Sequence, residues 1–214
     1  MGSRKKRLDI VFVLDGTGSM SSVQDQTLSA VNEYIETVKK AKEIDGNSTF
    51  SLSVFRQPMG NPKPTSTVEK IRDKVPLNKL EPLKPKEYEC FGMTPLLDAV
   101  GSTLSTVKAK KGAATIVVMT DGLENASTEY KLAQVKELVE KAKANEWNVI
   151  FLGADIDAFA ASAGLGTNVG TTMSVGKHKL AETMSSVAAS TRRYASGGVA
   201  QAAFTEEERK ESGK

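Results

Sequence analysis

The sequence predicts an α/β fold: a doubly wound, mostly parallel six-stranded sheet flanked by helices on both faces. Two near-continuous apolar runs, residues 8–14 and 113–120, are typical of central parallel strands that are covered on both sides. Segments with helical apolar spacing alternate with the strand-like segments. We expect one domain over residues 8–195, preceded by an extension or tag (1–7) and followed by a flexible tail (196–214).

Short apolar runs and alternating patterns mark the strands. The run 8–14 is interrupted only by Asp9, which favours a position inside the sheet. Residues 49–55 alternate Phe50, Leu52 and Val54 with polar side chains, which indicates a strand nearer an edge. The strands expected in chain order are 8–14, 49–55, a short one near 67–71, 113–120, 148–152 and 172–175.

Helices are expected where apolar residues recur every three or four positions behind a capping residue. Thr94 is expected to cap a helix with Pro95 at its first position, because proline is favoured there. Prolines between residues 56 and 92 leave room only for a helical turn near Asn78. The other expected helices are one capped by Ser21 or Ser22 and reaching about residue 44, one opened by Ser127 or Thr128 and running through 142, a short one over 155–163 stopped by Gly164, and a closing one over 177–194.

Composition favours a soluble protein that binds neither membranes nor nucleic acids. The net charge is only +3, and no segment approaches the ~18 apolar residues that a membrane span needs. The basic clusters at 4–7 and 108–111 are typical of solvated surface. Cys90 is the single cysteine, so no intrachain disulfide can form, and we expect a cytoplasmic protein.

Oxygen-bearing side chains gather where two of the predicted strands end. One group directly follows the run 8–14, and an aspartate follows the run 113–120. Right-handed crossovers place the carboxyl ends of parallel strands at one edge of the sheet, and a threonine at a helix start should fall there too. Carboxylate and hydroxyl oxygens suit small divalent cations. The sequence therefore predicts a metal site made of Asp15, Thr17, Ser19, Thr94 and Asp121.

The same loop is also similar to enzyme motifs. Residues 14–17 resemble the Asp-x-Asp-Gly-Thr motif of haloacid dehalogenase-like phosphatases, which attack phosphate with its first aspartate. Val13 stands at that position and cannot be a nucleophile. Residues 16–21 lack the third glycine of the dinucleotide-binding fingerprint, and the sequence has no Gly-Lys-Ser/Thr phosphate loop. We therefore predict a protein that is not an enzyme, and such a phosphatase is a remote alternative.

The predicted site resembles the metal-ion-dependent adhesion site of von Willebrand factor type A domains. That family pattern is Asp-x-Ser/Thr-x-Ser followed by a later threonine and aspartate. Asp15, Thr17, Ser19, Thr94 and Asp121 fill all five positions, with Thr17 as the permitted hydroxyl variant. The resemblance covers residues 8–194 and implies a Rossmann-like sheet. It is closest to the intracellular, microbial members of the family, since the chain has neither a signal segment nor a disulfide.

The resemblance implies how such a site works. Thr17, Ser19 and Thr94 would bind Mg²⁺ directly, with Mn²⁺ or Ca²⁺ possible, and the two aspartates would act mostly through waters. Because hydroxyls are neutral ligands, the cation stays electrophilic and accepts an Asp or Glu carboxylate from a partner protein. The alternative within the family is a scaffolding or regulatory module that needs no metal.

Residues near the site have plainer interpretations. Glu124 and Asn125 either shape partner choice at the rim or form an exposed polar loop, and Asp98 is expected to stabilise the start of its own helix rather than bind metal. His178 is expected at the surface. Met93 and Met119 are expected in or near the core. Cys90 is not expected to be a catalytic nucleophile, because the sequence has no histidine besides His178 that could act as its base.

Overall fold

Six strands form one sheet in the order β3-β2-β1-β4-β5-β6. The computed structural model describes residues 5–60, 68–197 and 199–213. β3 runs antiparallel to β2, and the other neighbouring strands are parallel. This confirms the predicted α/β class. The strands are β1 (Asp9–Asp15), β2 (Thr49–Phe55), β3 (Val68–Pro76), β4 (Ala114–Thr120), β5 (Asn148–Ala154) and β6 (Thr172–Val175).

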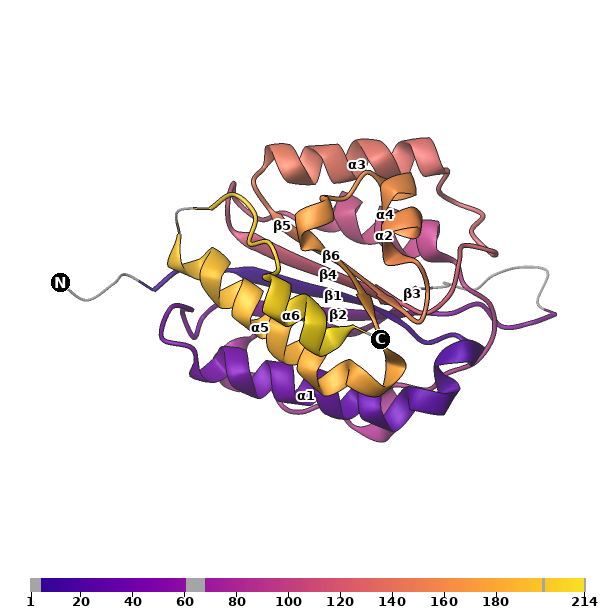
Figure 1. Cartoon of the computed structure of the whole chain (residues 1–214), viewed down its shortest axis with the longest axis horizontal. Helices are drawn as coiled ribbons and strands as arrows, with labels where there is room; N and C mark the ends of the chain where they lie inside the picture. Colours follow the sequence, from indigo (N-terminus) through magenta and orange to yellow (C-terminus); the bar gives the residue numbers. More distant parts are fainter. Residues whose placement is uncertain (1–4, 61–67, 198, 214) are drawn as a thin grey trace.

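Helices cover both faces of the sheet (Figure 1). One face carries α1 (Gln24–Lys40) and α5 (Leu180–Ser196), which pack against each other, with α6 (Glu206–Ser212) beside α5. The opposite face carries α2 (Leu96–Thr106), α3 (Leu132–Ala144) and α4 (Ala158–Leu165). Short 3-10 segments are η1 (Gly18–Val23), η2 (Leu77–Lys79), η3 (Pro85–Glu87), η4 (Val169–Thr171) and η5 (Lys177–Lys179).

The sheet separates two hydrophobic cores. Successive side chains of a strand point to opposite faces, so Phe12 of β1 packs with α1 and α5, while Val13 packs with α2 and α3. The strand β4 is buried along its whole length. Two-sided burial explains why β1 and β4 read as nearly continuous apolar runs in the sequence.

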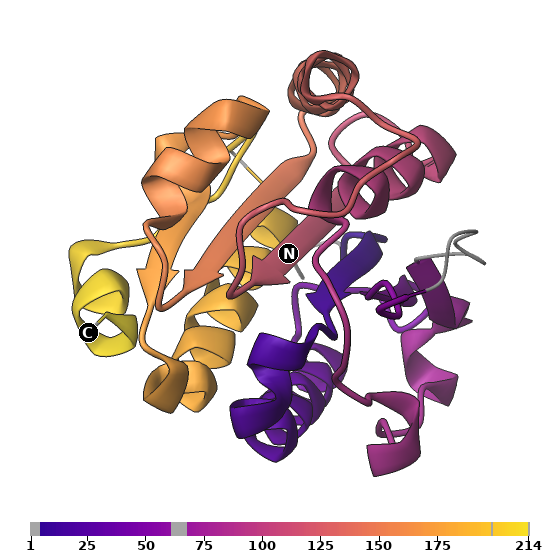
Figure 2. The same cartoon turned by 90° about the vertical axis from the view of Figure 1, so that its right-hand side faces the viewer.

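The register brings the ends of β1 and β4 together. Leu14 of β1 lies opposite Met119 of β4, which places Asp15 beside the end of β4. Figure 2 looks onto this edge, where the parallel strands end. The loops that follow β1 and β4 therefore meet at one rim, as the crossover rule requires.

Several predicted helix boundaries are wrong. The chain after β1 first forms η1, and α1 begins only at Gln24, because the Ser21 hydroxyl donates to the Gly18 carbonyl instead of capping a helix. Helix α3 begins at Leu132 rather than after Ser127 or Thr128. Local side-chain hydrogen bonds compete with helix formation at such serines and threonines.

Other elements differ from prediction in length. α4 starts after Asp157, whose carboxylate accepts hydrogen bonds from two backbone N–H groups, and it ends at Gly166, not Gly164. Gly166 has a φ of 78°, a left-handed conformation that glycine adopts without a steric penalty. The strand expected near 67–71 is β3, which extends to Pro76, whereas Thr67 lies outside the described residues. The helical turn near Asn78 is present as η2.

The segment expected to be a flexible tail contains the capped helix α6. The Thr205 hydroxyl accepts a hydrogen bond from Glu208 N, and Glu208 in turn accepts one from Thr205 N. Arg209 donates to the carbonyls of Thr172 and Gly170, and Phe204 is buried. The charged composition of this segment gives no sign of these tertiary contacts. Across the described parts of the chain, none of the helices has both the length and the apolar character that crossing a bilayer demands.

Candidate metal centre

Asp15 lies buried at the end of β1 and is held in one orientation. Its Oδ1 accepts a hydrogen bond from Thr17 N at 2.8 Å, and its Oδ2 accepts one from the Thr120 hydroxyl at 2.6 Å. The Tyr88 hydroxyl donates to the backbone carbonyl of Asp15 at 2.6 Å. Fixed partners on both carboxylate oxygens limit the directions in which Asp15 can face a ligand.

The hydroxyls of Thr17 and Ser19 converge with Asp121. Thr17 Oγ1 and Ser19 Oγ lie 3.2 Å apart, and Ser19 Oγ donates to Asp121 Oδ1 at 2.6 Å. The latter contact joins residues that are 102 positions apart in the chain. The structure thus brings three of the predicted ligands into direct contact around the rim.

Gly16 allows this loop to pass close to neighbouring chain. A Cβ at this position would lie 2.5 Å from Cγ1 of Val54 and 3.3 Å from the Glu89 carbonyl oxygen. Any side chain would therefore push the loop away from β2. Gly16 therefore serves close packing at the rim.

Thr94 reaches the same rim from the start of α2. Pro95 is the N-cap of α2, so the expectation that Thr94 caps this helix is wrong. Thr94 N donates to Asn125 Oδ1 at 2.8 Å, and Asn125 N donates to the Thr94 carbonyl at 3.1 Å. A Cβ on Gly122 would lie 3.0 Å from Thr94 Oγ1, which places this hydroxyl against the Asp121–Gly122 turn.

The two carboxylates are close enough to affect each other. Burial raises the pKa of the Asp15 carboxyl, hydrogen bonds from Thr120 and Thr17 lower it, and the nearby charge of Asp121 raises it again. Lys177 offsets this negative charge: its Nζ lies 2.6 Å from Asp121 Oδ2 and donates to the Ser19 carbonyl at 3.1 Å. The rim therefore already attracts one positive charge.

Sequence reasoning missed Thr120, Tyr88 and Lys177. Thr120 directly precedes Asp121 at the end of the strand, so its place at the rim could have been deduced from the register alone. Tyr88 and Lys177 arrive from distant segments, with no recognisable motif around either. Only the folded chain reveals that they touch the site.

Glu124, Asn125 and Asp98 act as internal supports. Glu124 accepts hydrogen bonds from the N–H groups of Leu97, Ala126 and Ser127 and from the Ser127 hydroxyl, while Asn125 binds the backbone of Thr94. Asp98 is buried in the first turn of α2, where it was expected to stabilise the helix start, and it also accepts from the N–H groups of residues 128–130. These contacts tie the loop after Asp121 to the start of α2.

The remaining residues of interest are peripheral. Met119 is buried as expected, whereas Met93 is 36% exposed, because its backbone pairs with Gln57 in a loop beyond the core. His178 is exposed, as expected. Burial raises the pKa of the half-buried Cys90 thiol, which keeps it in the unreactive protonated form at neutral pH.

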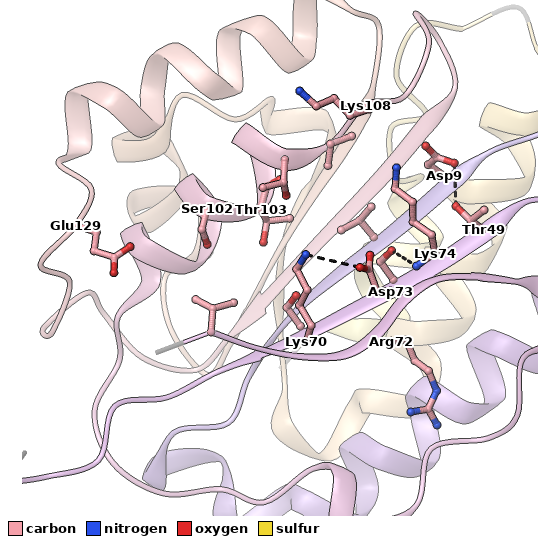
Figure 3. A pocket seen from close by; sticks show the side chains of 16 residues that line it. Asp9, Thr49, Lys70, Arg72, Asp73, Lys74, Ser102, Thr103, Lys108 and Glu129 are labelled. Carbon is pink, nitrogen blue, oxygen red and sulfur yellow. Dashed lines mark hydrogen bonds and ion pairs between the residues drawn. The ribbon is translucent and has the colours of Figure 1, made fainter. Parts of the chain in front are cut away.

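A trough-shaped hollow lies away from the rim, against β1, β2, β3 and α2 (Figure 3). This trough has a volume of about 360 Å³, and its lining includes Asp9, Lys70, Lys74 and Lys108. Lys70 Nζ lies 3.8 Å from Asp73 Oδ2, and both side chains are more than half exposed. This ion pair is long and exposed, unlike the contact between Lys177 and Asp121 at the rim.

The residues at the rim suit a small divalent cation that takes few carboxylates. Within the described residues, no three His, Cys, Asp or Glu side chains cluster as a metal site. Two carboxylates and hydroxyls supply the oxygens instead, a donor set that suits Mg²⁺, which keeps several of its waters. The ammonium of Lys177 beside Asp121 is an independent sign that this position favours positive charge.

Comparison with known proteins agrees with the fold. The model of the von Willebrand factor type A domain family matches residues 9–195. A von Willebrand factor type A structure from Catenulispora acidiphila superimposes with a TM-score of 0.57 at 15% identity, covering 87% of this chain and 43% of its own. No curated protein matches the chain.

Two adhesive or matrix proteins have the same fold. The pilus adhesin SpaC of Lactobacillus rhamnosus GG, in its open conformation, has a TM-score of 0.60 at 14% identity, over 88% of this chain and 30% of its own. Proximal thread matrix protein 1 of the mussel byssus has a TM-score of 0.58 at 13% identity, over 89% and 47%. The chain spans less than half of each of these three proteins. On the family match over most of its length, this chain belongs to the von Willebrand factor type A domain family.

Proposed function

We propose that this domain binds partner proteins through a divalent metal ion held at the rim by Asp15, Thr17, Ser19, Thr94 and Asp121. The observation that carries the proposal is the 2.6 Å hydrogen bond from Ser19 Oγ to Asp121 Oδ1, extended by the 3.2 Å approach of Thr17 Oγ1. These oxygens converge from loops far apart in the chain. Domains of this family typically mediate protein–protein interaction.

Hydroxyl ligands suit a metal that must accept a further ligand. A Mg²⁺ ion bound there would supply an electrophilic position, because neutral oxygens leave most of its charge unquenched. Asp121 orients the Ser19 hydroxyl by accepting its hydrogen bond, and Asp15 holds the loop between them by accepting one from Thr17 N. An Asp or Glu side chain of a partner is the anionic oxygen ligand that would complete such a site.

A binding role is proposed in preference to catalysis. Val13 stands where a haloacid dehalogenase-like phosphatase would carry its nucleophile, and it is buried in the core. Cys90 is half-buried and has a raised thiol pKa, so it is no candidate nucleophile either. A role inside the cell is part of the same proposal and rests on this single cysteine, which cannot form an intrachain disulfide.

Isothermal titration with MnCl₂ and MgCl₂ tests the metal site. The unmodified domain should bind metal, and Ser19→Ala, which removes a proposed ligand, should weaken Mn²⁺ affinity by at least about tenfold, the loss that even a ligand-orienting group causes. Ser21→Ala is the matched control, since Ser21 lies on the same η1 segment and donates only to the Gly18 carbonyl. Absence of any metal heat at millimolar concentration would refute the proposal.

Pull-downs from a lysate with and without EDTA test the interaction. Partners held through the metal should be lost with EDTA and recovered with added Mg²⁺. Asp121→Ala should lose the same partners without chelation. Equal recovery of the same partners with and without EDTA would favour the alternative, a scaffolding module that needs no metal.

A further inference from the structure

Lys177, which follows the edge strand β6, contributes a positive charge to the rim. It lies on η5, directly after β6, and its Nζ is 2.6 Å from Asp121 Oδ2 and 3.1 Å from the Ser19 carbonyl oxygen. The Asp121 side chain is fully buried, and that of Lys177 is only 23% exposed. The contact is therefore shielded from solvent, unlike an ordinary surface ion pair.

The backbone around Lys177 is anchored on two sides. Gly176 N donates to the Ser212 carbonyl of α6 at 3.1 Å, and Lys177 N donates to Asp155 Oδ1 at 3.4 Å, at the end of β5. These bonds set the starting point of the side chain relative to the rim. The reach of the ammonium to Asp121 is thus built into the fold.

The neighbouring Lys179 forms an ordinary exposed ion pair and serves as a comparison for Lys177. Lys179 lies on the same η5 segment, and its Nζ is 3.9 Å from Glu182, with both side chains more than a third exposed. Lys177 differs in its shorter distance, its burial and its partner, which is a predicted metal ligand. Among the lysines of η5, Lys177 is the one directed at the site.

We propose that Lys177 is a tethered cation that competes with the divalent metal for Asp121 and so sets the metal affinity of the domain. This inference rests on the proposed metal-dependent function. An ammonium and a metal ion that share one carboxylate repel each other, and in a shielded site this repulsion is weakly screened. Metal binding must therefore displace the ammonium from Asp121 or tolerate it nearby, and both lower affinity.

Three variants separate charge from shape. Lys177→Met removes the charge and keeps an unbranched side chain, Lys177→Arg keeps the charge, and Lys179→Met removes a charge from the same segment without touching Asp121. Isothermal titration with MnCl₂ measures the dissociation constant of each. We expect Lys177→Met to bind Mn²⁺ about tenfold more tightly than the unmodified domain, a gain of about 1.4 kcal/mol. Lys177→Arg and Lys179→Met should stay within about threefold.

The outcomes distinguish this inference from the proposed function. If the unmodified domain binds Mn²⁺ and Lys177→Met binds no more tightly, the inference falls and the metal site stands. If neither protein binds Mn²⁺, the proposed function falls and the inference falls with it. Binding by Lys177→Met alone would show that the lysine closes the site to metal, so the competition would stand and the proposed function would fall for the unmodified domain.

Stability in EDTA gives a reading that does not depend on metal binding. In a double-mutant cycle, Lys177→Met should lower the melting temperature when Asp121 is present, because it leaves a buried carboxylate without its counter-charge. The same substitution should have a smaller effect in the background of Asp121→Asn. Equal effects in both backgrounds would show that the two side chains are not coupled and would overturn the inference.

Discussion

The two ends of β1 each carry an aspartate, but their surroundings differ. Asp15, at the carboxyl end, is buried and accepts hydrogen bonds from Thr17 N and the Thr120 hydroxyl. Asp9, at the other end, is half-buried, accepts a bond from the Thr49 hydroxyl at 2.8 Å and lines the trough of Figure 3. Neighbouring groups thus hold both carboxylate oxygens of Asp15, whereas the Thr49 hydroxyl holds one oxygen of Asp9.

The cations of the rim and of the trough differ in the same way. At the rim, Lys177 approaches Asp121 to 2.6 Å with little exposure to solvent. In the trough, Lys70 stands 3.8 Å from Asp73, and the two side chains are 58% and 64% exposed. Solvent and salt screen the second pair much more than the first. A hollow such as the trough can therefore be lined by charged groups that are only loosely held.

Neutralising each of the two aspartates in turn is the most direct test of this difference. Asp15→Asn should weaken Mn²⁺ binding about 100-fold, the upper range for loss of a group that orients metal ligands. The free energy of unfolding of the metal-free protein should change by less than about 1 kcal/mol, because losing a buried charge offsets weakened hydrogen bonds. Titration calorimetry and urea unfolding in EDTA measure the two quantities.

Asp9→Asn is the control at the opposite end of the same strand. It keeps an oxygen acceptor for Thr49 and lies away from the rim, so Mn²⁺ affinity should not change. If Asp9→Asn weakens metal binding as much as Asp15→Asn does, the assignment of the site to the rim is wrong.

The sequence predicted well what depends on short-range pattern. The buried strands β1 and β4 were found because two-sided burial produces apolar runs, and the register then brings Asp15 beside the end of β4. Four of the five candidate ligands were named because they follow the predicted strands, and Thr94 because it was expected to open a helix, although α2 begins after Pro95. That they bind a metal stays a prediction.

Features that depend on tertiary contacts could not be predicted. Ser127 looked like a helix cap, but its hydroxyl binds Glu124, and Thr128 N binds Asp98. The charged segment after residue 205 looked like a flexible tail, but the Arg209 guanidinium binds backbone carbonyls before β6. In both cases a polar side chain satisfies a distant backbone group, and local propensity carries no trace of such a partner.

Support beneath the rim is tested by Glu124→Ala. Glu124 accepts three backbone hydrogen bonds and one from a hydroxyl, all of 2.7–2.9 Å. Removing it should lower the free energy of unfolding by about 2 kcal/mol, since bonds to a charged acceptor are among the stronger ones. Urea unfolding measures this. Glu129→Ala, on the same loop but exposed, should change stability by less than about 0.5 kcal/mol, and equal losses would contradict a supporting role.

A smaller effect is expected from the pair between Arg72 and Glu87. The Arg72 side chain lines part of the trough but turns away from Lys70 and Lys74 (Figure 3). Its guanidinium donates two hydrogen bonds to Glu87. The hydrogen bond from Arg72 lowers the pKa of the Glu87 carboxyl. Its stabilising contribution is therefore complete above the unfolded-state pKa of about 4.3 and is lost as the pH falls through the lower folded-state value.

Glu87→Gln should reduce the free energy of unfolding by about 1 kcal/mol at pH 7. The difference from the unmodified protein should persist down to about pH 5 and shrink below about pH 4. Urea unfolding at a series of pH values measures it. A difference that grows as the pH falls would have the opposite sign and would rule out a depressed carboxyl pKa as the cause.

The smallest effect is expected at Lys70. Its ion pair with Asp73 is long and exposed, and such pairs contribute little because solvent screens them and ordering both side chains costs entropy. Lys70→Ala should change the free energy of unfolding by less than about 0.5 kcal/mol and leave Mn²⁺ affinity unaltered. A loss above about 1 kcal/mol would mean that the trough is as firmly organised as the rim. The contrast between the rim and the trough would then rest on the metal site alone, because lysines in both places would be held with comparable strength.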